Sequence, residues 1–256
     1  MSTVDISLGE VAASVALVAL AVAVSFWRRA ELEQDLAVAV LRSFVQLTAI
    51  GYVIQAIFDS DSLWLVVGLL AVMVGFGAFT ARSRAREVPD ALGPLVLALS
   101  AAAAITLGLV LALGVFVAEP RYLVPVGGMV IGNSMTAAAV ALNRLADEVR
   151  GQAGLIEAML ALGATSGQAA RGLVTRSLRS GMIPLIDSTK TTGIVFFPGT
   201  MVGMLVAGAE PIDAVRLQLI LLWVLLGSVA LAALISVSIG YRSFFTPAHQ
   251  LKEPPA

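Results

Sequence analysis

The sequence predicts an all-α protein that crosses a membrane about seven times, and three observations lead to this fold. Hydrophobic residues make up 59% of the chain and charged residues 13%, whereas soluble domains carry about 25% charged residues. Uncharged stretches long enough to span a bilayer recur along the chain. No stretch shows the alternating pattern of a membrane barrel strand, so helices must satisfy the backbone hydrogen bonds in lipid.

The expected membrane helices follow from segments of about 20 mostly apolar residues. The first segment extends back to Leu8, and the second extends back through Arg42 to Leu36. The uncharged stretches are residues 11–27, 43–58, 62–81, 91–118, 122–143 and 217–241. A seventh segment, residues 181–209, qualifies if Asp187 and Lys190 are tolerated inside the membrane.

The distribution of Lys and Arg predicts the orientation, because basic residues gather in cytoplasmic loops. Twelve of the 16 basic residues lie in the odd-numbered loops and the tail, and two lie in even-numbered loops. The N-terminus is therefore expected outside and the C-terminus inside, in the cell's inner (plasma) membrane. The first helix is not expected to be a cleaved signal peptide, because its arginines follow it. We expect one transmembrane domain, residues 1–245, with a cytoplasmic segment at 144–180, and a disordered tail at 246–256.

The composition also excludes several kinds of chemistry. The chain has no cysteine, one histidine (His249) and a net charge of -1, so neither thiolate metal sites nor a nucleic-acid partner are expected. A phosphate-binding loop needs Gly-x4-Gly-Lys-Ser/Thr, and neither Lys190 nor Lys252 has that context. The chain is therefore not expected to be an enzyme, to bind ATP by such a loop or to carry a cofactor. Any metal ligands stay unknown at this stage.

The cytoplasmic segment is too long for a bare loop, so it should contain helices. Leu155, Met159 and Leu162 fall on one helical face, and Gly163 is a suitable end for that helix. Thr165, three residues before a glutamine, has the spacing of a capping box that would start a second, basic helix at residues 166–180. Its arginines are either an anchor for anionic lipid headgroups or a docking surface for a cytoplasmic protein.

The first of these helices resembles the EAA motif of ABC-transporter permeases, which reads Glu-Ala-Ala, three residues, Gly. Glu157, Ala158 and Gly163 match, and Met159 replaces the second alanine. The motif continues in the family to an Ile-x-Leu-Pro element, for which this chain has Leu-x-Thr-Arg at residues 173–176. The resemblance implies that Glu157, Ala158 and Gly163 contact an ATPase, and we add Arg171 to this predicted docking surface.

A wider resemblance covers roughly residues 36–245 and is strongest from 127 to 208. The similar runs are Gly-Met-Val-Ile-Gly-Asn-Ser-Met at 128–135, Ala-Leu-Asn-Arg-Leu at 141–145, the stretch 157–165, Ile-Pro-Leu-Ile-Asp-Ser-Thr-Lys-Thr-Thr-Gly at 183–193 and Phe-Pro-Gly-Thr-Met-Val-Gly at 197–203. The chain thus resembles the FetB-type permease family, which includes a bacterial iron-export permease and plant aluminium-tolerance half-transporters. This resemblance implies a homodimer working with a separate ATPase subunit, transport out of the cell and, for the bacterial branch, iron.

Polar residues inside the predicted spans are the candidates for a substrate path. Asp187 and Lys190 are three apart and lie on one side of a helix. Lys190 lies about 15 Å deep if the membrane begins at residue 180, whereas both charges lie at the cytoplasmic interface if residues 191–209 form the span. The remaining candidates for the path or its gating are Pro184, Gln46, Asn133, Pro198 and Gly199.

Three functional hypotheses follow. The first is the membrane subunit of an ATP-driven exporter. The second is an ion-coupled secondary transporter that uses Asp187 and Lys190 as a relay. The third is a non-transporting membrane protein whose basic segment binds lipid or a regulator.

Overall fold

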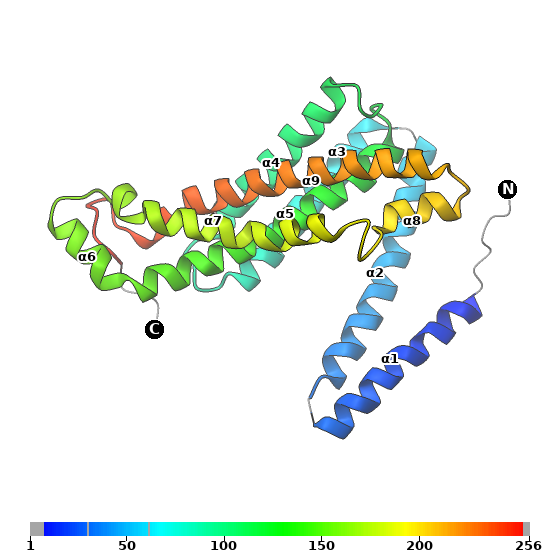
Figure 1. Cartoon of the computed structure of the whole chain (residues 1–256), viewed down its shortest axis with the longest axis horizontal. Coiled ribbons are helices and arrows are strands. Elements are labelled where there is room, and N and C mark those ends of the chain that lie inside the picture. Colours follow the sequence, from blue (N-terminus) through cyan, green and yellow to red (C-terminus); the bar gives the residue numbers. More distant parts are fainter. Residues whose placement is uncertain (1–7, 30, 61, 253–256) are drawn as a thin grey trace. The chain divides into compact units, whose positions relative to one another are not determined.

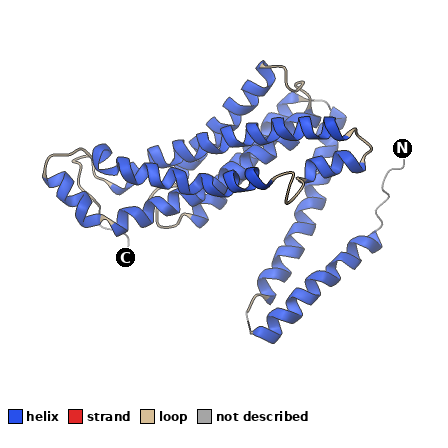
Figure 2. Cartoon of the chain, viewed as in Figure 1, coloured by secondary structure: helices blue, strands red, loops and turns tan. Residues whose placement is uncertain are grey.

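The computed structural model describes residues 8–29, 31–60 and 62–252. Every regular element in these ranges is a helix, and the extended backbone pairs only at two isolated bridges (Figure 2). The all-α prediction is therefore confirmed. The chain divides into two compact units, residues 1–61 and 62–256, which are described in turn.

The first unit is a helical hairpin of α1 (Leu8–Arg28) and α2 (Glu33–Ser60). Its turn is held by Ser25, whose hydroxyl accepts a hydrogen bond from the Leu32 backbone N–H at 3.1 Å and donates one to the Glu33 carboxylate at 2.8 Å. Ser25 is buried by this arrangement. Glu33 stands in the first turn of α2, where a negative charge is favourable next to the free backbone N–H groups.

The second unit is a bundle with α5 at its centre (Figure 1). Helix α5 packs against α3, α4, α7 and α9, while the short α6 and α8 are attached near opposite ends. The helices of this unit are α3 (Leu63–Arg84), α4 (Leu92–Ala112), α5 (Pro120–Gly151), α6 (Ala153–Ala161), α7 (Ser166–Thr191), α8 (Gly199–Val206), α9 (Pro211–Gly240) and the 3-10 turn η1 (Tyr241–Phe244).

Small residues let these helices approach closely. The buried core is rich in alanine on α3, α4, α5 and α9. A Cβ placed on Gly181 of α7 would lie 2.7 Å from the carbonyl oxygen of Ala137 and 2.8 Å from the Cβ of Ala141, both on α5. The α5–α7 contact therefore requires glycine at residue 181.

Helix length and composition support several membrane crossings. Among the described residues, α2, α3, α4, α5 and α9 with η1 are long and apolar enough to span, and α1 contains a shorter apolar stretch, Val15–Arg28. The prediction of a multi-pass membrane protein is confirmed at this level. The number of crossings and the orientation stay predictions.

The seventh predicted span, residues 181–209, is not one helix, and this prediction was wrong. Helix α7 begins at Ser166, so the predicted basic helix and the start of the span are continuous; it then ends at Thr191. Gly193 adopts a φ of +85°, which favours glycine and stops the helix, and Pro198 becomes the N-cap of α8. Pro184 lies within α7 without ending it. Prolines are tolerated inside membrane helices where other groups satisfy the freed carbonyl.

The tail also departs from the expected disorder, at least to Lys252. Phe245 and Leu251 form an antiparallel bridge, and the Lys252 backbone N–H donates to the Phe244 carbonyl at 2.8 Å. Both phenylalanines, Phe244 and Phe245, are buried in the core of the bundle. Local composition favoured disorder, but these two aromatic anchors hold the following residues in place. The expected disorder of residues 253–256 falls outside the described residues.

Candidate functional site

The turn between α6 and α7 has the structure that the sequence predicts. Helix α6 closes with two hydrogen bonds, from Ala164 N–H to the Met159 carbonyl at 3.0 Å and from Gly163 N–H to the Leu160 carbonyl at 2.9 Å. Gly163 has a φ of +91°, the left-handed conformation that such a helix end requires. The glycine therefore turns the chain back so that α7 can begin.

The predicted capping box at the start of α7 is also present. The Thr165 hydroxyl accepts from the Gln168 N–H at 3.3 Å, and the Gln168 side chain accepts from the Thr165 N–H at 2.8 Å. The tail adds a further contact, because Nδ1 of His249 lies 3.0 Å from the Ser166 hydroxyl and accepts the Ser166 N–H at 3.3 Å. Free backbone N–H groups at this helix start are thus satisfied by side chains.

Helix α6 has one face inside the bundle and one face uncovered. Ile156 is buried, and Met159 and Leu160 pack partly against the core. On the other side, Leu155 is 59% exposed and Leu162 is 88% exposed. Neighbouring large apolar side chains with such high exposed fractions are typical of a surface that contacts another molecule.

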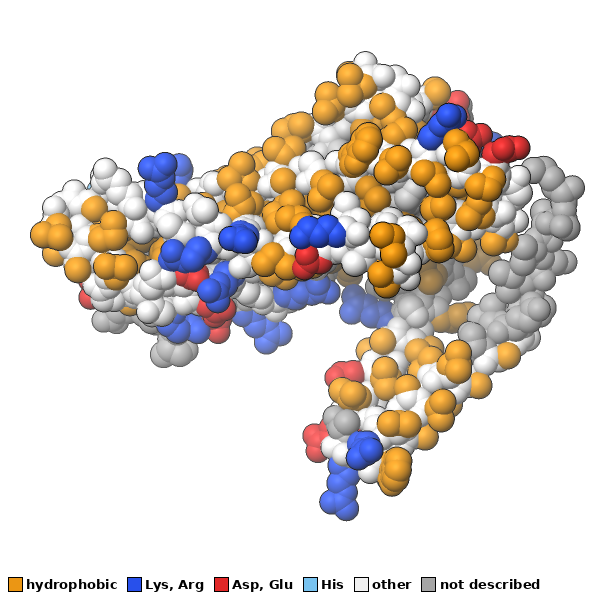
Figure 3. All heavy atoms as spheres, viewed as in Figure 1, with side chains coloured by type: hydrophobic (Ala, Val, Ile, Leu, Met, Phe, Trp, Pro, Cys, Tyr) orange, Lys and Arg blue, Asp and Glu red, His pale blue; other side chains and the backbone are white. Residues whose placement is uncertain are grey.

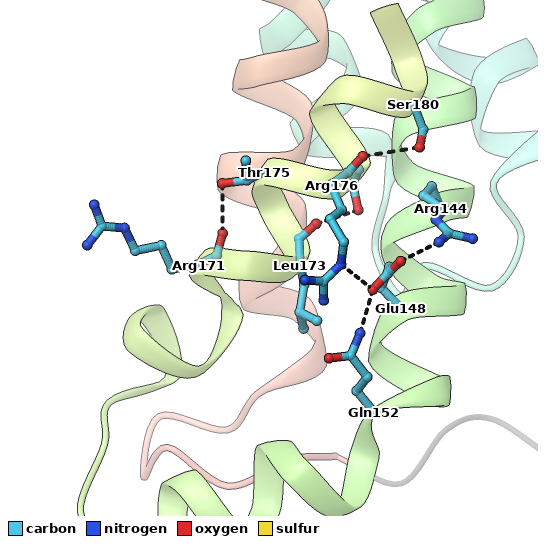
Figure 4. Close-up of polar contacts among 9 residues, drawn as sticks. Arg144, Glu148, Gln152, Arg171, Leu173, Thr175, Arg176 and Ser180 are labelled. Atoms are coloured by element: carbon cyan, nitrogen blue, oxygen red, sulfur yellow. Dashed lines mark hydrogen bonds and ion pairs between the residues drawn. The ribbon is translucent and has the colours of Figure 1, made fainter. Parts of the chain in front are cut away.

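The predicted docking residues lie on this uncovered side. Glu157 and Ala158 are exposed on α6, and Gly163 is exposed at the turn. Arg171 is exposed on α7, and its side chain points away from the polar contacts between α5 and α7 (Figure 4). The structure thus brings Glu157, Ala158 and Gly163 together on one short segment and leaves Arg171 separate on the next helix.

A buried carboxylate joins the two long helices next to α6. Glu148 of α5 is only 6% exposed. It accepts from Nε of Arg176 on α7 at 2.7 Å and forms an ion pair with Arg144 one turn back on α5; Gln152 also donates to it (Figure 4). Two arginines and one amide therefore neutralise and satisfy this carboxylate, as a buried charge requires.

We refer to Arg144, Glu148, Gln152 and Arg176 as the Glu148 cluster. The cluster was not predicted from the sequence, where Arg144 and Arg176 are basic loop residues within the runs 141–145 and 173–176. One local signal was available: Arg144, Glu148 and Gln152 recur every four residues and so share a helix face. The contact with Arg176 on another helix could not be read from spacing.

Three packing contacts show which residues lie at the same level along the bundle. Ser134 of α5 lies 3.4 Å from Ser228 of α9, hydroxyl to hydroxyl. Gly181 of α7 packs against Ala137 and Ala141 of α5. Because α7 runs opposite to α5, a rise of 1.5 Å per residue places Asp187, about 9 Å beyond Gly181, level with Asn133.

This level is the middle of the apolar part of the bundle. The uncharged run of α5, residues 122–143, has its midpoint between Gly132 and Asn133, and that of α9, residues 217–241, has its midpoint at Val229. Asp187 is thus level with the centre of both runs. Glu148 lies about 22 Å from that centre, beyond the half-thickness of about 15 Å of a bilayer's hydrocarbon layer.

Asp187 and Lys190 are both uncovered at this level. Their side chains are 64% and 70% exposed, and Nζ of Lys190 lies 3.5 Å from a carboxylate oxygen of Asp187. Next to them on α7, Pro184 and Ser188 line a cavity of about 140 Å³ together with Asn133. The structure therefore brings the predicted path residues Asn133 and Pro184 together at one cavity, and Asp187 lies on the same part of α7 without lining it.

The other predicted path residues have different positions. Pro198 and Gly199 lie where α8 begins, after the break that follows α7. Gln46 is exposed on α2, in the first unit. Among the described residues, no group of three or more acidic or histidine side chains is placed to hold a metal ion.

Comparison with known proteins gives the class. A rice (Oryza sativa subsp. japonica) protein, UPF0014 membrane protein STAR2, is 40% identical over 242 residues, which cover 94% of this chain and 85% of the rice protein. The Arabidopsis thaliana protein ALUMINUM SENSITIVE 3 is 39% identical over 94% of this chain and 88% of its own length. The probable iron export permease protein FetB of Escherichia coli (strain K12) is 32% identical over 98% and 97%. With the apolar helices, these relatives define a multi-pass membrane protein.

The family follows from the match over nearly the whole chain. The model described as "Uncharacterised protein family (UPF0014)" matches residues 8–245. The chain belongs to this family, as the resemblance to FetB-type permeases predicts. No solved structure matches it.

Proposed function

We propose that this chain is the membrane subunit of an ATP-driven exporter in the inner (plasma) membrane, and that α6 docks on a separate cytoplasmic ATPase of the ABC class. One observation carries the proposal: a short helix with uncovered Leu155 and Leu162 lies at the end of two helices that continue into the apolar bundle. A partner that moved α6 would move α5 and α7 directly. Energy released in another polypeptide would thus enter by contact.

The Glu148 cluster supports the same mechanism. A push on α6 reaches α7 only if α5, α6 and α7 move together. The ion pair of Glu148 with Arg176 ties α7 to α5, and Gln152, at the α5–α6 junction, is the third donor. We assign to this cluster the role of a rigid joint between the docking helix and the membrane helices.

The proposed cargo is a metal cation, iron first. The E. coli relative is named a probable iron export permease, and the chain matches nearly its whole length. In this chain Asp187 provides an exposed carboxylate level with the middle of the apolar runs of α5 and α9, and iron(II) accepts carboxylate and carbonyl oxygen ligands. A path with few ligands suits release, because a transported ion must bind weakly enough to leave.

Vesicles with an inverted membrane test the proposal directly. Inside-out vesicles from cells that express the chain should take up radioactive iron(II) only with ATP, and a protonophore should not stop the uptake. Leu162→Asp should lower the ATP-driven rate about tenfold, since loss of one apolar anchor costs about 1.4 kcal/mol or more of docking free energy. Gln250→Asp is the control, because its exposed side chain lies in the tail near the start of α7 and outside α6. An iron(II) uptake rate that is the same with and without ATP would refute the proposal.

A second candidate function rests on the uncovered pair of Asp187 and Lys190. Ionisable side chains at mid-membrane level are rare and often serve as relays in secondary transporters. In that case a protonophore would abolish iron(II) uptake and ATP would be unnecessary. The same vesicle experiment therefore separates the two functions.

A further inference from the structure

A cavity of about 370 Å³ lies at the end of α3, where the chain turns towards α4. Two arginines, Arg82 and Arg86, line it together with Ser83 and Asp90. Phe79, one helical turn before Arg82, adds an apolar side chain that is 62% exposed. We call the cavity formed by these five residues the α3-end cavity. It combines positive charge with an apolar surface.

The loop that forms this cavity is held in place by its buried residues. Ala85, Val88 and Ala91 are all buried and belong to the core of the bundle. The Ala85 N–H donates to the Ala81 carbonyl at 2.9 Å, and the Val88 N–H donates to the Ala85 carbonyl at 3.2 Å. The backbone beneath the charged side chains is therefore fixed to the bundle.

The two arginines of the cavity are not neutralised by the bundle itself. Within the described residues 62–252, neither of them forms an ion pair. Glu87, the acid next to Arg86, pairs with Arg150 at 2.9 Å instead. Nε of Arg86 donates to the Ser83 carbonyl at 2.9 Å, which leaves the terminal amino groups of this guanidinium to a ligand. The same bond covers a carbonyl at the end of α3 that would otherwise repel an anion.

The charged residues that line the cavity have a net charge of plus one. Arg82 and Arg86 contribute two positive charges, and Asp90 contributes one negative charge. Arginine binds phosphate oxygens through pairs of parallel N–H bonds, and a phosphate diester with its single negative charge would neutralise this set. The Asp90 carboxylate accepts hydrogen bonds, so it suits hydroxyl groups attached to such a diester. Free phosphate carries more negative charge at pH 7 and would be repelled by Asp90.

The register between α3 and α5 places the cavity near the surface of the membrane. A Cβ on Gly77 of α3 would lie 3.5 Å from Ile131 and 3.8 Å from Met135, so Gly77 is level with the middle of the apolar run of α5. Arg82 lies about 7.5 Å beyond Gly77 along α3, and the helix ends about 10 Å beyond it. Long arginine side chains that start there can extend to the headgroups, about 15 Å from the middle of the bilayer.

The α3-end cavity lies at the same end of the bundle as α6. The ion pair between Glu87 and Arg150 joins the loop to the last turn of α5, directly before α6. Hydrophobic side chains dominate much of the bundle surface away from the α6 end, and basic side chains are more frequent towards it (Figure 3). Anionic headgroups of the cytoplasmic leaflet attract such basic surfaces, and basic cavities at this depth bind them.

We propose that the α3-end cavity binds the headgroup of one anionic phospholipid that carries hydroxyl groups beyond its phosphate, the chemistry of phosphatidylglycerol. Arg82 and Arg86 bind the phosphate diester, and the Ser83 hydroxyl donates to it. Asp90 accepts from the glycerol hydroxyls of the headgroup. Phe79 contacts the beginning of an acyl chain. This site is a property of the chain alone and does not rest on the proposed transport function.

Native mass spectrometry of the full chain in detergent tests the site, because it resolves each bound lipid. The unmodified chain should retain one phosphatidylglycerol at lipid concentrations that leave phosphatidylethanolamine, which has no net charge, unbound. Arg82→Gln and Arg86→Gln should each raise the dissociation constant of this first lipid about tenfold, since each removes a charged hydrogen-bond donor. The matched control is Arg84→Gln, which removes the same charge from an exposed position of α3 outside the cavity and should change the constant less than about twofold.

Two comparisons identify the ligand. Phosphatidic acid has the phosphate but no glycerol hydroxyls beyond it, so the unmodified chain should bind it several-fold more weakly than phosphatidylglycerol. Asp90→Asn should abolish this preference, and asparagine tolerates the φ of +50° at this residue. Inorganic phosphate at millimolar concentration should not displace the lipid. Displacement would assign the cavity to free phosphate and overturn the lipid as its ligand.

Other outcomes also overturn the proposal. Equal affinities of Arg82→Gln, Arg86→Gln and Arg84→Gln for phosphatidylglycerol would show that these arginines attract headgroups only through general charge. If the two cavity variants bind the lipid like the unmodified chain but lower ATP-driven iron(II) uptake, the cavity belongs to the contact with the ATPase instead. Failure of the proposed transport function would not change the lipid affinities, because they are measured on the chain without a partner.

Discussion

Replacing Arg176 by alanine removes the ion pair that ties α7 to α5. Glu148 is 6% exposed and loses the donor at 2.7 Å, but it keeps Arg144 and Gln152. A hydrogen bond to a charged group contributes about 1.5–3 kcal/mol. The Arg176 side chain is 47% exposed, so water partly compensates and the lower end, about 1.5 kcal/mol, is expected. For a soluble domain of this size the loss corresponds to a Tm lower by about 3–6 °C.

The control for this prediction is Arg179→Ala, which removes the same side chain three residues further along α7. Arg179 is exposed, and its replacement should change the free energy of unfolding by less than about 0.5 kcal/mol. Thermal unfolding of the detergent-purified chain, followed by tryptophan fluorescence, measures both variants. Equal shifts for the two variants, or no shift for Arg176→Ala, would refute the Glu148 cluster as a joint between α5 and α7.

Three further predictions concern the ends and contacts of the same helices. Gly163→Ala should lower the free energy of unfolding by about 1 kcal/mol, because residue 163 has a positive φ. The matched change Gly154→Ala in α6 should raise the free energy of unfolding by about 0.5–1 kcal/mol, because alanine favours a helix more than glycine does. A denaturant titration that gives both changes the same sign would contradict this. Thr165→Ala should cost about 1 kcal/mol through loss of the capping box, and Thr175→Ala on the exposed side of α7 should cost less, as compared by thermal unfolding. Gly181→Leu should separate α7 from α5 and abolish a stable fold in detergent, and a monodisperse variant on size-exclusion chromatography with unchanged Tm would show that the contact is loose.

Local sequence signals predicted the helix boundaries around Gly163 well. The apolar spacing before Gly163 and the Thr165–Gln168 pair correctly indicated the end of α6 and the start of α7. Such signals succeed because caps and helix ends depend on residues within a few positions of one another. The change from basic to apolar composition near Ser180 predicted a helix boundary there, but α7 is continuous through this residue. A change of composition does not by itself end a helix.

Contacts between residues far apart in the sequence could not be predicted from spacing or composition. Glu148 pairs with Arg176, which lies on another helix 28 residues further along the chain. The tail after Thr246 looked disordered because its order depends on Phe244 and Phe245 being buried among other helices. In both places the decisive partner is many residues away, and composition says nothing about it.

The sequence by itself determined that this is an all-α, multi-pass membrane protein and which family it belongs to, because hydropathy and residue identity are properties of the chain. It left two depths open for Asp187 and Lys190. Only the packing of α7 against α5, through Gly181 and its alanine neighbours, put them level with the centre of the apolar runs. The physical reason is that depth in a bundle is set by the register between helices, and register is fixed where side chains of different helices meet.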